Sequence, residues 1–269
     1  MIGAAAGDII GSVYEFDPIK TKDFPLFGSR SEFTDDTVLT MAVAHAIRTG
    51  AGYREAIREI GNRYPESGYG SSFVLWLFGL VDEPYYSWGN GSAMRVSPVG
   101  FAFDSRRKVL AEAEKTAEIT HDHPEGIKGA QATALAIFLA ASGAEKEEIE
   151  EEIEKEFGYD LDRTVADIRP EYRWEASCQK TVPEAIVCFL DSVSFEDAIR
   201  NAVSLGGDSD TLACITGSIA EAYYRKIPPG ILAEVRNRLP DDLWNICADF
   251  YTEYGHPETR EQIRSVENG

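Results

Sequence analysis

Apolar residues recur at helical spacing along most of this chain, and long alternating stretches of β-branched residues are missing. Between Val38 and Ile47 the apolar positions form one stripe, which ends at Gly50. Ranges 109–117, 126–141, 184–190, 212–224 and 243–254 show similar apolar patterns. Because sheet content should be low, the pattern predicts an all-α fold. We expect a single compact orthogonal multi-helix globule of about a dozen helices.

The chain has 269 residues, enough for one large domain or two small ones. No Gly/Ser-rich or Pro-rich linker divides it, so residues 1–269 are predicted to form a single domain. No apolar run approaches the roughly 20 residues of a membrane span. The N-terminal segment lacks a basic region and reaches Asp8 too early for a signal-peptide core. We therefore expect a cytoplasmic protein without a membrane partner, and favour a monomer.

The formal net charge is −20, from 46 acidic and 26 basic residues. An excess of this size disfavours non-specific binding to nucleic acid or to an anionic membrane. The four cysteines form no C-x-x-C pair, and we expect buried reduced thiols. Residues 145–156 are almost all Glu and Lys, with Ile149, Ile153 and Phe157 spaced by four, which indicates a solvated helix with one apolar stripe rather than an interaction surface.

Two acidic motifs of the same design stand far apart in the chain, Thr34-Asp35-Asp36-Thr37 and Asp208-Ser209-Asp210-Thr211. Each precedes an apolar helical run, so each is a good helix N-cap. One cap residue suffices for a helix, however, and each motif carries a surplus carboxylate. Carboxylate and hydroxyl oxygens are the ligands that hard divalent cations prefer. If folding brings the motifs together, bound cations would offset the crowding of four carboxylates.

Small residues line one face of the N-terminal apolar segment, at Gly7, Gly11 and Ser12. Another backbone could therefore approach this face closely. Glu15 follows among apolar neighbours. It is either a surface residue at a helix end or a carboxylate that acts on substrate near the cations.

The loop from Ser87 to Arg95 is rich in glycine and asparagine and leads into a possible helix start. Exposed backbone N–H groups in such a loop suit phosphate, although an ordinary turn is an equal alternative. Further along, His121 and His123 could ligate zinc, but His45 and His256 supply no matching set. Capping before Pro124 is the structural alternative, and we favour a polar contact from His121 to a ligand.

Together these segments resemble the ADP-ribosylglycohydrolase family, which includes dinitrogenase reductase-activating glycohydrolases and eukaryotic ADP-ribosyl-acceptor hydrolases. The resemblance extends from Gly3 to about Tyr224 and includes Thr120-His121. Its other motifs, in chain order, are Gly7-Asp8 with Gly11-Ser12 and Glu15, Phe33-Thr34-Asp35-Asp36-Thr37, Gly89-Asn90-Gly91-Ser92-Ala93-Met94-Arg95 and Gly206-Gly207-Asp208-Ser209-Asp210-Thr211.

The resemblance implies an all-α globule with two Mg²⁺ or Mn²⁺ ions in a central cleft. It implies hydrolysis of the N- or O-glycosidic bond at C1″ of the distal ribose in an ADP-ribosyl group. Glu15 and Asp35 would be catalytic, and Asp210 would bridge the ions. The implied metal ligands are Thr34, Asp35, Asp36, Asp208, Asp210 and Thr211. The implied substrate contacts are Ser87, Trp88, Gly89, Asn90, Gly91 and His121.

The substrate would be an ADP-ribosylated protein or small molecule, and arginine-, serine-, O-acetyl- and nucleic-acid-linked ADP-ribose all stay open. One alternative is another metal-dependent hydrolase of a nucleotide or diphosphate. Aspartate-rich enzymes of that kind usually carry D-D-x-x-D within a helix, which this chain lacks. A second alternative is a family member that binds ADP-ribose without turnover, but all the presumed ligands and Glu15 are present.

Overall fold

The computed structural model describes residues 1–267 and is all-α, as predicted. Within these residues the β-type pairing is limited to an isolated antiparallel bridge between Gly89 and Ser177. The elements are α1 (Ile2–Gly11), the 3-10 helix η1 (Ser12–Tyr14), α2 (Asp35–Thr49), α3 (Tyr53–Gly61), α4 (Ser71–Leu77), α5 (Gly91–Met94), α6 (Ser97–Ala102), α7 (Arg106–Glu118), α8 (Pro124–Ser142), α9 (Lys146–Phe157), α10 (Val165–Ile168), α11 (Cys178–Leu190), α12 (Phe195–Leu205), α13 (Ser209–Tyr224), α14 (Pro229–Arg238), α15 (Asp241–Tyr254) and α16 (Pro257–Glu267).

The apolar ranges identified in the sequence lie within α2, α7, α8, α11, α13 and α15, and each of these helices begins two to six residues before its range. The Thr34 side chain caps α2 by accepting from the Asp36 N–H, and Gly50 ends the helix in the left-handed conformation, with a φ of 72°. The His123 side chain caps α8, and Pro124 is its first residue. The short helices α4, α5, α6 and α10 carry the count past about a dozen, because four to seven residues are too few to show an apolar period.

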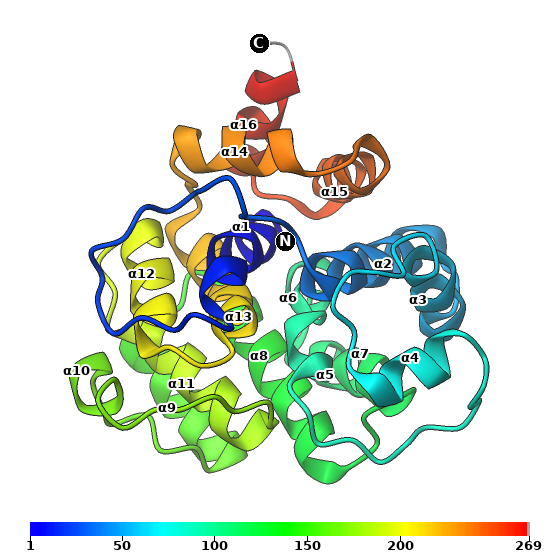
Figure 1. Cartoon of the computed structure of the whole chain (residues 1–269), viewed down its shortest axis with the longest axis horizontal. Coiled ribbons are helices and arrows are strands. Elements are labelled where there is room, and N and C mark those ends of the chain that lie inside the picture. The colour runs from blue at the N-terminus through cyan, green and yellow to red at the C-terminus, as the bar shows by residue number, and fades with distance from the viewer. Residues whose placement is uncertain (268–269) are drawn as a thin grey trace.

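Helix α13 runs through the middle of the fold and lies against α1 (Figure 1). Their backbones touch because α1 carries glycines on the facing side. A Cβ atom built on Gly3 or Gly7 would lie 2.1 Å from the Gly217 carbonyl oxygen or 1.9 Å from that of Ala213. One on Gly11 would lie 2.4 Å from the Ser209 carbonyl oxygen. The two helices are thus antiparallel, and the end of α1 lies at the start of α13.

A buried carboxylate holds the other end of this helix pair. Glu221 on α13 accepts from the ammonium of Met1 and from the Gly3 N–H, each at 2.7 Å. It also accepts from the Tyr251 hydroxyl of α15. Because Glu221 bonds to both α1 and α15, the direction of α1 is fixed relative to the core.

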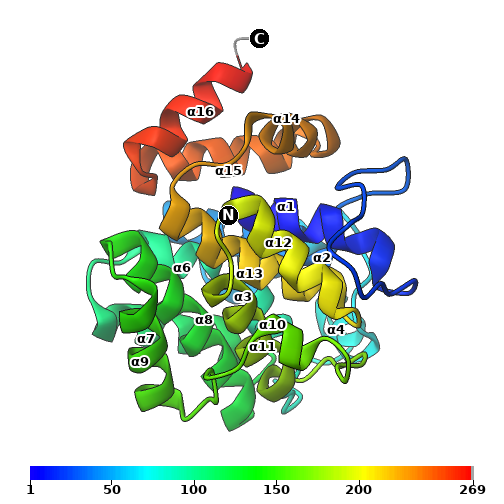
Figure 2. The ribbon, with the colours of Figure 1, turned by 90° about the vertical axis from the view of Figure 1, so that its left-hand side faces the viewer.

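Helices α14, α15 and α16 form a layer on one side of α1, α12 and α13 (Figure 2). On the other side lie α7, α8, α9 and α11. In α9 only Ile149 and Ile153 are buried, so the Glu/Lys run is a solvated helix, as predicted. All four cysteines are free and buried, also as predicted. Within residues 1–267, no helix combines the length and the apolar character needed to cross a membrane.

Candidate active site

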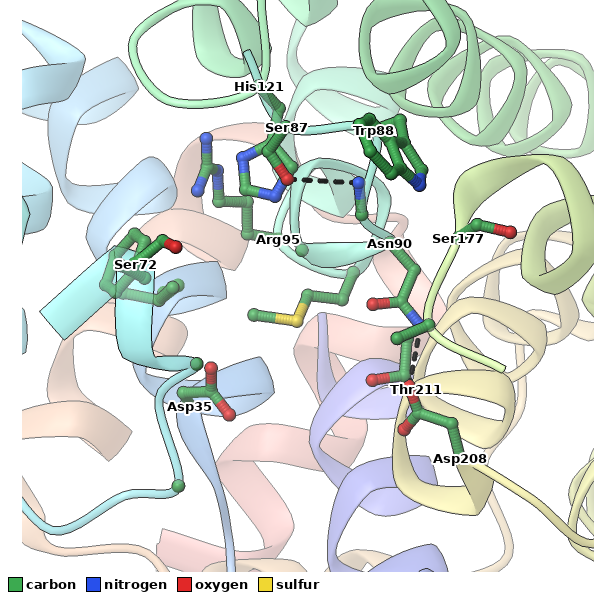
Figure 3. A pocket seen from close by; sticks show the side chains of 18 of the residues that line it. Asp35, Ser72, Ser87, Trp88, Asn90, Arg95, His121, Ser177, Asp208 and Thr211 are labelled. Atoms are coloured by element: carbon green, nitrogen blue, oxygen red, sulfur yellow. Dashed lines mark hydrogen bonds between the residues drawn. The ribbon is translucent and has the colours of Figure 1, made fainter. Parts of the chain in front are cut away.

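A cavity of about 630 Å³ opens at the start of α2 and α13, within the usual size of small-molecule and cofactor pockets. Figure 3 shows Asp35 on one wall, Asp208 and Thr211 on another, and the Ser87–Asn90 loop with His121 above them. Segments far apart in sequence therefore build one site. Of the predicted site residues, its lining includes Glu15, Thr34, Asp35, Ser87, Trp88, Gly89, Asn90, Gly91, His121, Asp208, Asp210 and Thr211.

Folding brings the two acidic motifs into direct contact. The Thr211 hydroxyl donates to the Asp36 carboxylate, with Oγ1 3.0 Å from Oδ2. Carboxylate oxygens of Asp8, Asp36 and Asp210 lie within 4.8 Å of one another, and those of Glu15, Asp208 and Asp210 do the same. Asp210 therefore belongs to two adjacent carboxylate clusters.

Burial and mutual repulsion make these carboxylates hard to ionise in the absence of a cation. Burial, with Asp8 and Asp35 nearby, raises the pKa of Asp36 well above its usual range. Burial, with Asp208 and Asp36 nearby, does the same to the pKa of Asp210. Buried carboxylates whose oxygens lie this close together fit a bound divalent cation, which would compensate their charge.

Asp8 was part of a sequence motif but was not among the expected site residues. Its carboxylate is fully buried and accepts from the Thr34 N–H at 2.9 Å and the Thr34 hydroxyl at 2.8 Å. It also accepts from the N–H of Thr37 at 3.1 Å and from the Thr37 hydroxyl. Asp8 thus ties α1 to the start of α2. The sequence signal was an acidic residue inside the otherwise apolar run from Ile2 to Ile10.

Asp35 lines the cavity but belongs to neither cluster. Its N–H donates to the Ser67 carbonyl at 2.7 Å, and its carboxylate faces the cavity opposite Asp208 (Figure 3). Burial, with Asp8 and Asp208 nearby, raises the pKa of Asp35 to about 8. The geometry allows it to act on a group inside the cavity, and its role as a metal ligand stays a prediction.

Glu15 directly follows η1 and is the third member of the second cluster, with Asp208 and Asp210. Burial, with Asp208 and Asp8 nearby, raises the pKa of Glu15 to about 7. A carboxylate that titrates near neutral pH is suited to accept or donate a proton during catalysis. Its position beside Asp208 and Asp210 also allows it to ligate a cation.

The glycine-rich loop is attached directly to the second acidic motif. The Asn90 side-chain amide donates to the Asp208 carboxylate at 2.7 Å, and Asp208 makes no side-chain capping bond to α13. The loop also pairs with the segment before α11, since the Asn90 N–H donates to Ala176 O and the Cys178 N–H to Trp88 O. The position of the loop is therefore linked to that of the carboxylates.

The two histidines that follow α7 have separate surroundings. His121 is buried and lines the cavity, whereas His123 caps α8 and packs against the rings of Tyr86 and Trp88. The expected contact from His121 to a ligand is therefore possible from its position. Trp88 is 53% exposed at the mouth of the cavity, where a ligand could cover it.

The lining also includes residues that were not expected from the sequence as site residues, among them Phe73, Tyr85, Arg95 and Trp174. Trp174 stands in an irregular segment before α11 and is 57% exposed. Neither periodicity nor a motif marks it in the sequence. Arg95 lies within the glycine-rich motif, but its burial could not be read from the spacing.

The chain matches the ADP-ribosylglycohydrolase family over residues 1–260. It is 26% identical to ADP-ribosylhydrolase ARH3 of Homo sapiens, with 83% of this chain and 84% of the relative covered. It is also 26% identical to ADP-ribosylarginine hydrolase Tri1 of Pseudomonas putida, with 83% and 69% covered. A solved "ADP-ribosylglycohydrolase-related protein complex" superposes with a TM-score of 0.73 at 25% identity, covering 94% of this chain and 95% of that one. The chain belongs to the ADP-ribosylglycohydrolase family of enzymes.

Proposed function

We propose that this enzyme removes ADP-ribosyl groups from an acceptor by metal-dependent hydrolysis of the glycosidic bond at C1″ of the distal ribose. The observation that carries the proposal is a pair of carboxylate clusters that share Asp210, of which the cluster of Glu15, Asp208 and Asp210 lines a ligand-sized cavity. Two clusters suit two ions, which we take to be Mg²⁺ or Mn²⁺ because the donors are all oxygen atoms.

The proposed ligands come from both acidic motifs, with Asp210 in the shared position. Bound cations would orient the ribose hydroxyls and supply electrostatic stabilisation to the reacting centre. Thr34, Asp35 and Asp36 approach from α2, and Asp208, Asp210 and Thr211 approach from α13. Asp8 would hold the α2 group in place through Thr34 and Thr37.

Two carboxylates near the proposed cations are candidates for proton transfer. Glu15 and Asp35 both line the cavity, and in the absence of a cation burial and neighbouring carboxylates raise their pKa values to about 7 and about 8. We propose that Glu15 acts at the reacting ribose, where it could direct a water or protonate the leaving group. Asp35, which lies across the cavity from Asp208 (Figure 3), is the second candidate for the same step.

The proposed substrate contacts come mainly from the loop of residues 87–91. Ser87, Gly89, Asn90 and Gly91 line the cavity and would contact the diphosphate. The Gly89 N–H donates to Ser87 Oγ and the Asn90 N–H to Ala176 O, so the backbone donors to the diphosphate would come from Ser87 and Gly91. Trp88 would pack on the adenosine and His121 would donate to the ligand. Asn90 cannot offer all its donors to substrate, since its amide bonds to Asp208 and Thr181.

We also propose an acceptor class, a compartment and an oligomeric state. We expect the substrate to be an ADP-ribosylated protein or small molecule. We also expect residues 1–269 to form a single domain, and the protein to act as a monomer in the cytoplasm.

Release assays test the function directly. The protein with Mg²⁺ or Mn²⁺ is incubated with arginine-, serine-, O-acetyl- and nucleic-acid-linked ADP-ribose, and free ADP-ribose is measured. Release of AMP or inorganic phosphate instead would contradict the proposed bond.

A further inference from the structure

Trp174 and Glu175 are neighbours in the chain and both line the cavity, and the proposed reaction uses neither of them. The Trp174 side chain is exposed, which leaves much of a large aromatic surface uncovered. The Glu175 Oε1 atom accepts from the N–H groups of Ala176 and Ser177, at 3.1 and 3.0 Å. Its Oε2 atom lies 3.9 Å from Nζ of Lys180, an exposed side chain. The carboxylate is therefore held in place by its own segment, and Oε2 is left able to bind a further group.

This segment lies at the end of the cavity where the cations and the distal ribose are proposed to bind. A Cβ atom built on Gly207 would lie 3.0 Å from the Arg173 carbonyl oxygen, and Gly207 directly precedes Asp208. At the other end of the segment, the Ala176 carbonyl accepts from the Asn90 N–H at 2.8 Å. The Asn90 side chain in turn donates to Asp208, and Figure 3 shows both on the same side of the cavity. The indole and the carboxylate thus lie between two contacts that both lead to Asp208.

The same end of the cavity is negatively charged. The carboxylates that meet there are Asp8, Glu15, Asp35, Asp36, Asp208 and Asp210. Two divalent cations would not compensate all of these carboxylates once they are ionised, and Glu175 adds a further negative charge. Among the lining residues that the structure describes, the one lysine or arginine is Arg95, which is fully buried. A positively charged acceptor is therefore favoured over a neutral or an anionic one.

A guanidinium is the cation that suits both side chains. It is planar, it pairs with a carboxylate through two parallel N–H groups, and it stacks on an aromatic face. A guanidinium that carries ADP-ribose on one nitrogen is still a cation. Serine-linked and O-acetyl-linked ADP-ribose instead place a neutral group beside the ribose, which gains nothing from Glu175.

We propose that Trp174 and Glu175 form the acceptor site of this enzyme, and that the acceptor they select is the guanidinium of an arginine side chain. The guanidinium would stack on the Trp174 indole and donate to Glu175 Oε2. The assignment rests on the proposed function, because the proposed reaction places the acceptor next to the distal ribose.

Two substitutions test the acceptor site. Trp174→Leu keeps an apolar side chain but removes the aromatic face, and Glu175→Gln keeps an oxygen for the two backbone N–H groups but removes the charge. Each should lower kcat/KM for release of ADP-ribose from an arginine-linked peptide about tenfold, which corresponds to roughly 1.4 kcal/mol. Trp174→Phe keeps a ring and should lose less. Glu171→Gln removes the charge of an exposed glutamate nearby in the chain and should behave like the wild type.

Free ADP-ribose has no acceptor, so its affinity should be unchanged in both variants, as measured by calorimetry with Mn²⁺. The same measurement shows that the variants are folded. A loss of ADP-ribose affinity in Trp174→Leu that matches its loss of kcat/KM would place the indole on the ADP-ribose itself and overturn the acceptor site. Unchanged release from the arginine-linked peptide in both variants would also overturn it.

The wild type separates this inference from the proposed function. It should release ADP-ribose from the arginine-linked peptide with a higher kcat/KM than from serine-linked, O-acetyl-linked or nucleic-acid-linked ADP-ribose. Release from one of those three but not from arginine would overturn the assigned acceptor and leave the proposed function intact. No release from any of the substrates would contradict the proposed function, and the acceptor site with it.

Discussion

Thr211 and Asp36 are 175 residues apart in the sequence, yet the Thr211 hydroxyl lies 3.0 Å from the Asp36 carboxylate. This contact joins the start of α13 to the start of α2. The close approach of α1 to α13 places Asp8 and Glu15 in the same region. The clusters therefore form where the end of α1 meets the starts of α2 and α13. Substituting the carboxylates or the residues at the helix contacts should alter cation binding.

Asp210→Ala should abolish both cation binding and turnover, because Asp210 is shared by both clusters. We expect the rate of ADP-ribose release to fall by about 100-fold or more, since even residues that only support a metal ligand cost up to about that factor. Calorimetry with Mn²⁺ and a release assay measure the two effects. Asp162→Ala, at an exposed position, is the matched control and should behave like the wild type. Wild-type Mn²⁺ affinity in the Asp210→Ala protein would rule out the shared site.

Asp8→Asn should lower the free energy of unfolding by about 2 kcal/mol in the presence of Mn²⁺. An amide cannot replace a carboxylate whose two oxygens accept from the N–H and hydroxyl groups of Thr34 and Thr37. Thr37→Val removes a single donor and should cost about 1 kcal/mol. Urea unfolding measures both values. Equal stability of Asp8→Asn and the wild type would mean that Asp8 does not hold α2 to α1.

Gly7→Ala tests the contact between α1 and α13. Its Cβ would lie 1.9 Å from the Ala213 carbonyl oxygen, so the helices must separate. We expect a loss of about 3 kcal/mol in the free energy of unfolding, at the upper end for an overpacked core. Gly230→Ala in α14 is the control, because a Cβ there meets nothing within 4 Å. That variant should change stability by less than about 1 kcal/mol, in the stabilising direction. A tolerated Gly7→Ala would show that this glycine face is not needed.

The sequence predicted much of this arrangement, for reasons that the structure makes clear. Gly7 and Gly11 are spaced by one helical turn, which predicts a close backbone approach, and both do contact α13. The spacing could not say which helix would approach, because small residues on α1 fit any partner with a matching face. The helix start at Thr34 was predicted because capping is local chemistry, set by residues adjacent in sequence. Capping before Pro124, which the sequence offered as the structural alternative, is provided by His123.

What the sequence could not predict depends on contacts between distant segments. Trp174 reaches the cavity because the segment before α11 pairs with the glycine-rich loop, as in the bond from the Asn90 N–H to Ala176 O. The burial of Arg95 depends on Thr116 and Thr120, which follow it by more than 20 residues. Neither contact has a local pattern, so neither could be found from periodicity or motif spacing.

The stability of the cation-free protein should fall as pH rises. The pKa values of Asp8, Glu15 and Asp35 are raised to about 6, about 7 and about 8. The folded state therefore holds protons that the unfolded chain releases. By linkage, the stability from these protons is full below about pH 4 and is lost as pH rises to about 8. Urea unfolding in chelator between about pH 5 and pH 8 measures this slope, and the stabilisation gained on adding Mn²⁺ should grow with pH, since cations bind the ionised carboxylates.

Asp35→Asn is the variant that tests the cause of this pH dependence. It removes the group with a pKa of about 8 and a charge that acts on Asp36, so the cation-free slope should become shallower, most visibly above about pH 6. Asp162→Asn, at an exposed site, should leave the slope unchanged. An identical slope in Asp35→Asn and the wild type would place the pH dependence outside the cavity. A cation-free stability that rises over this range would contradict the raised pKa values themselves.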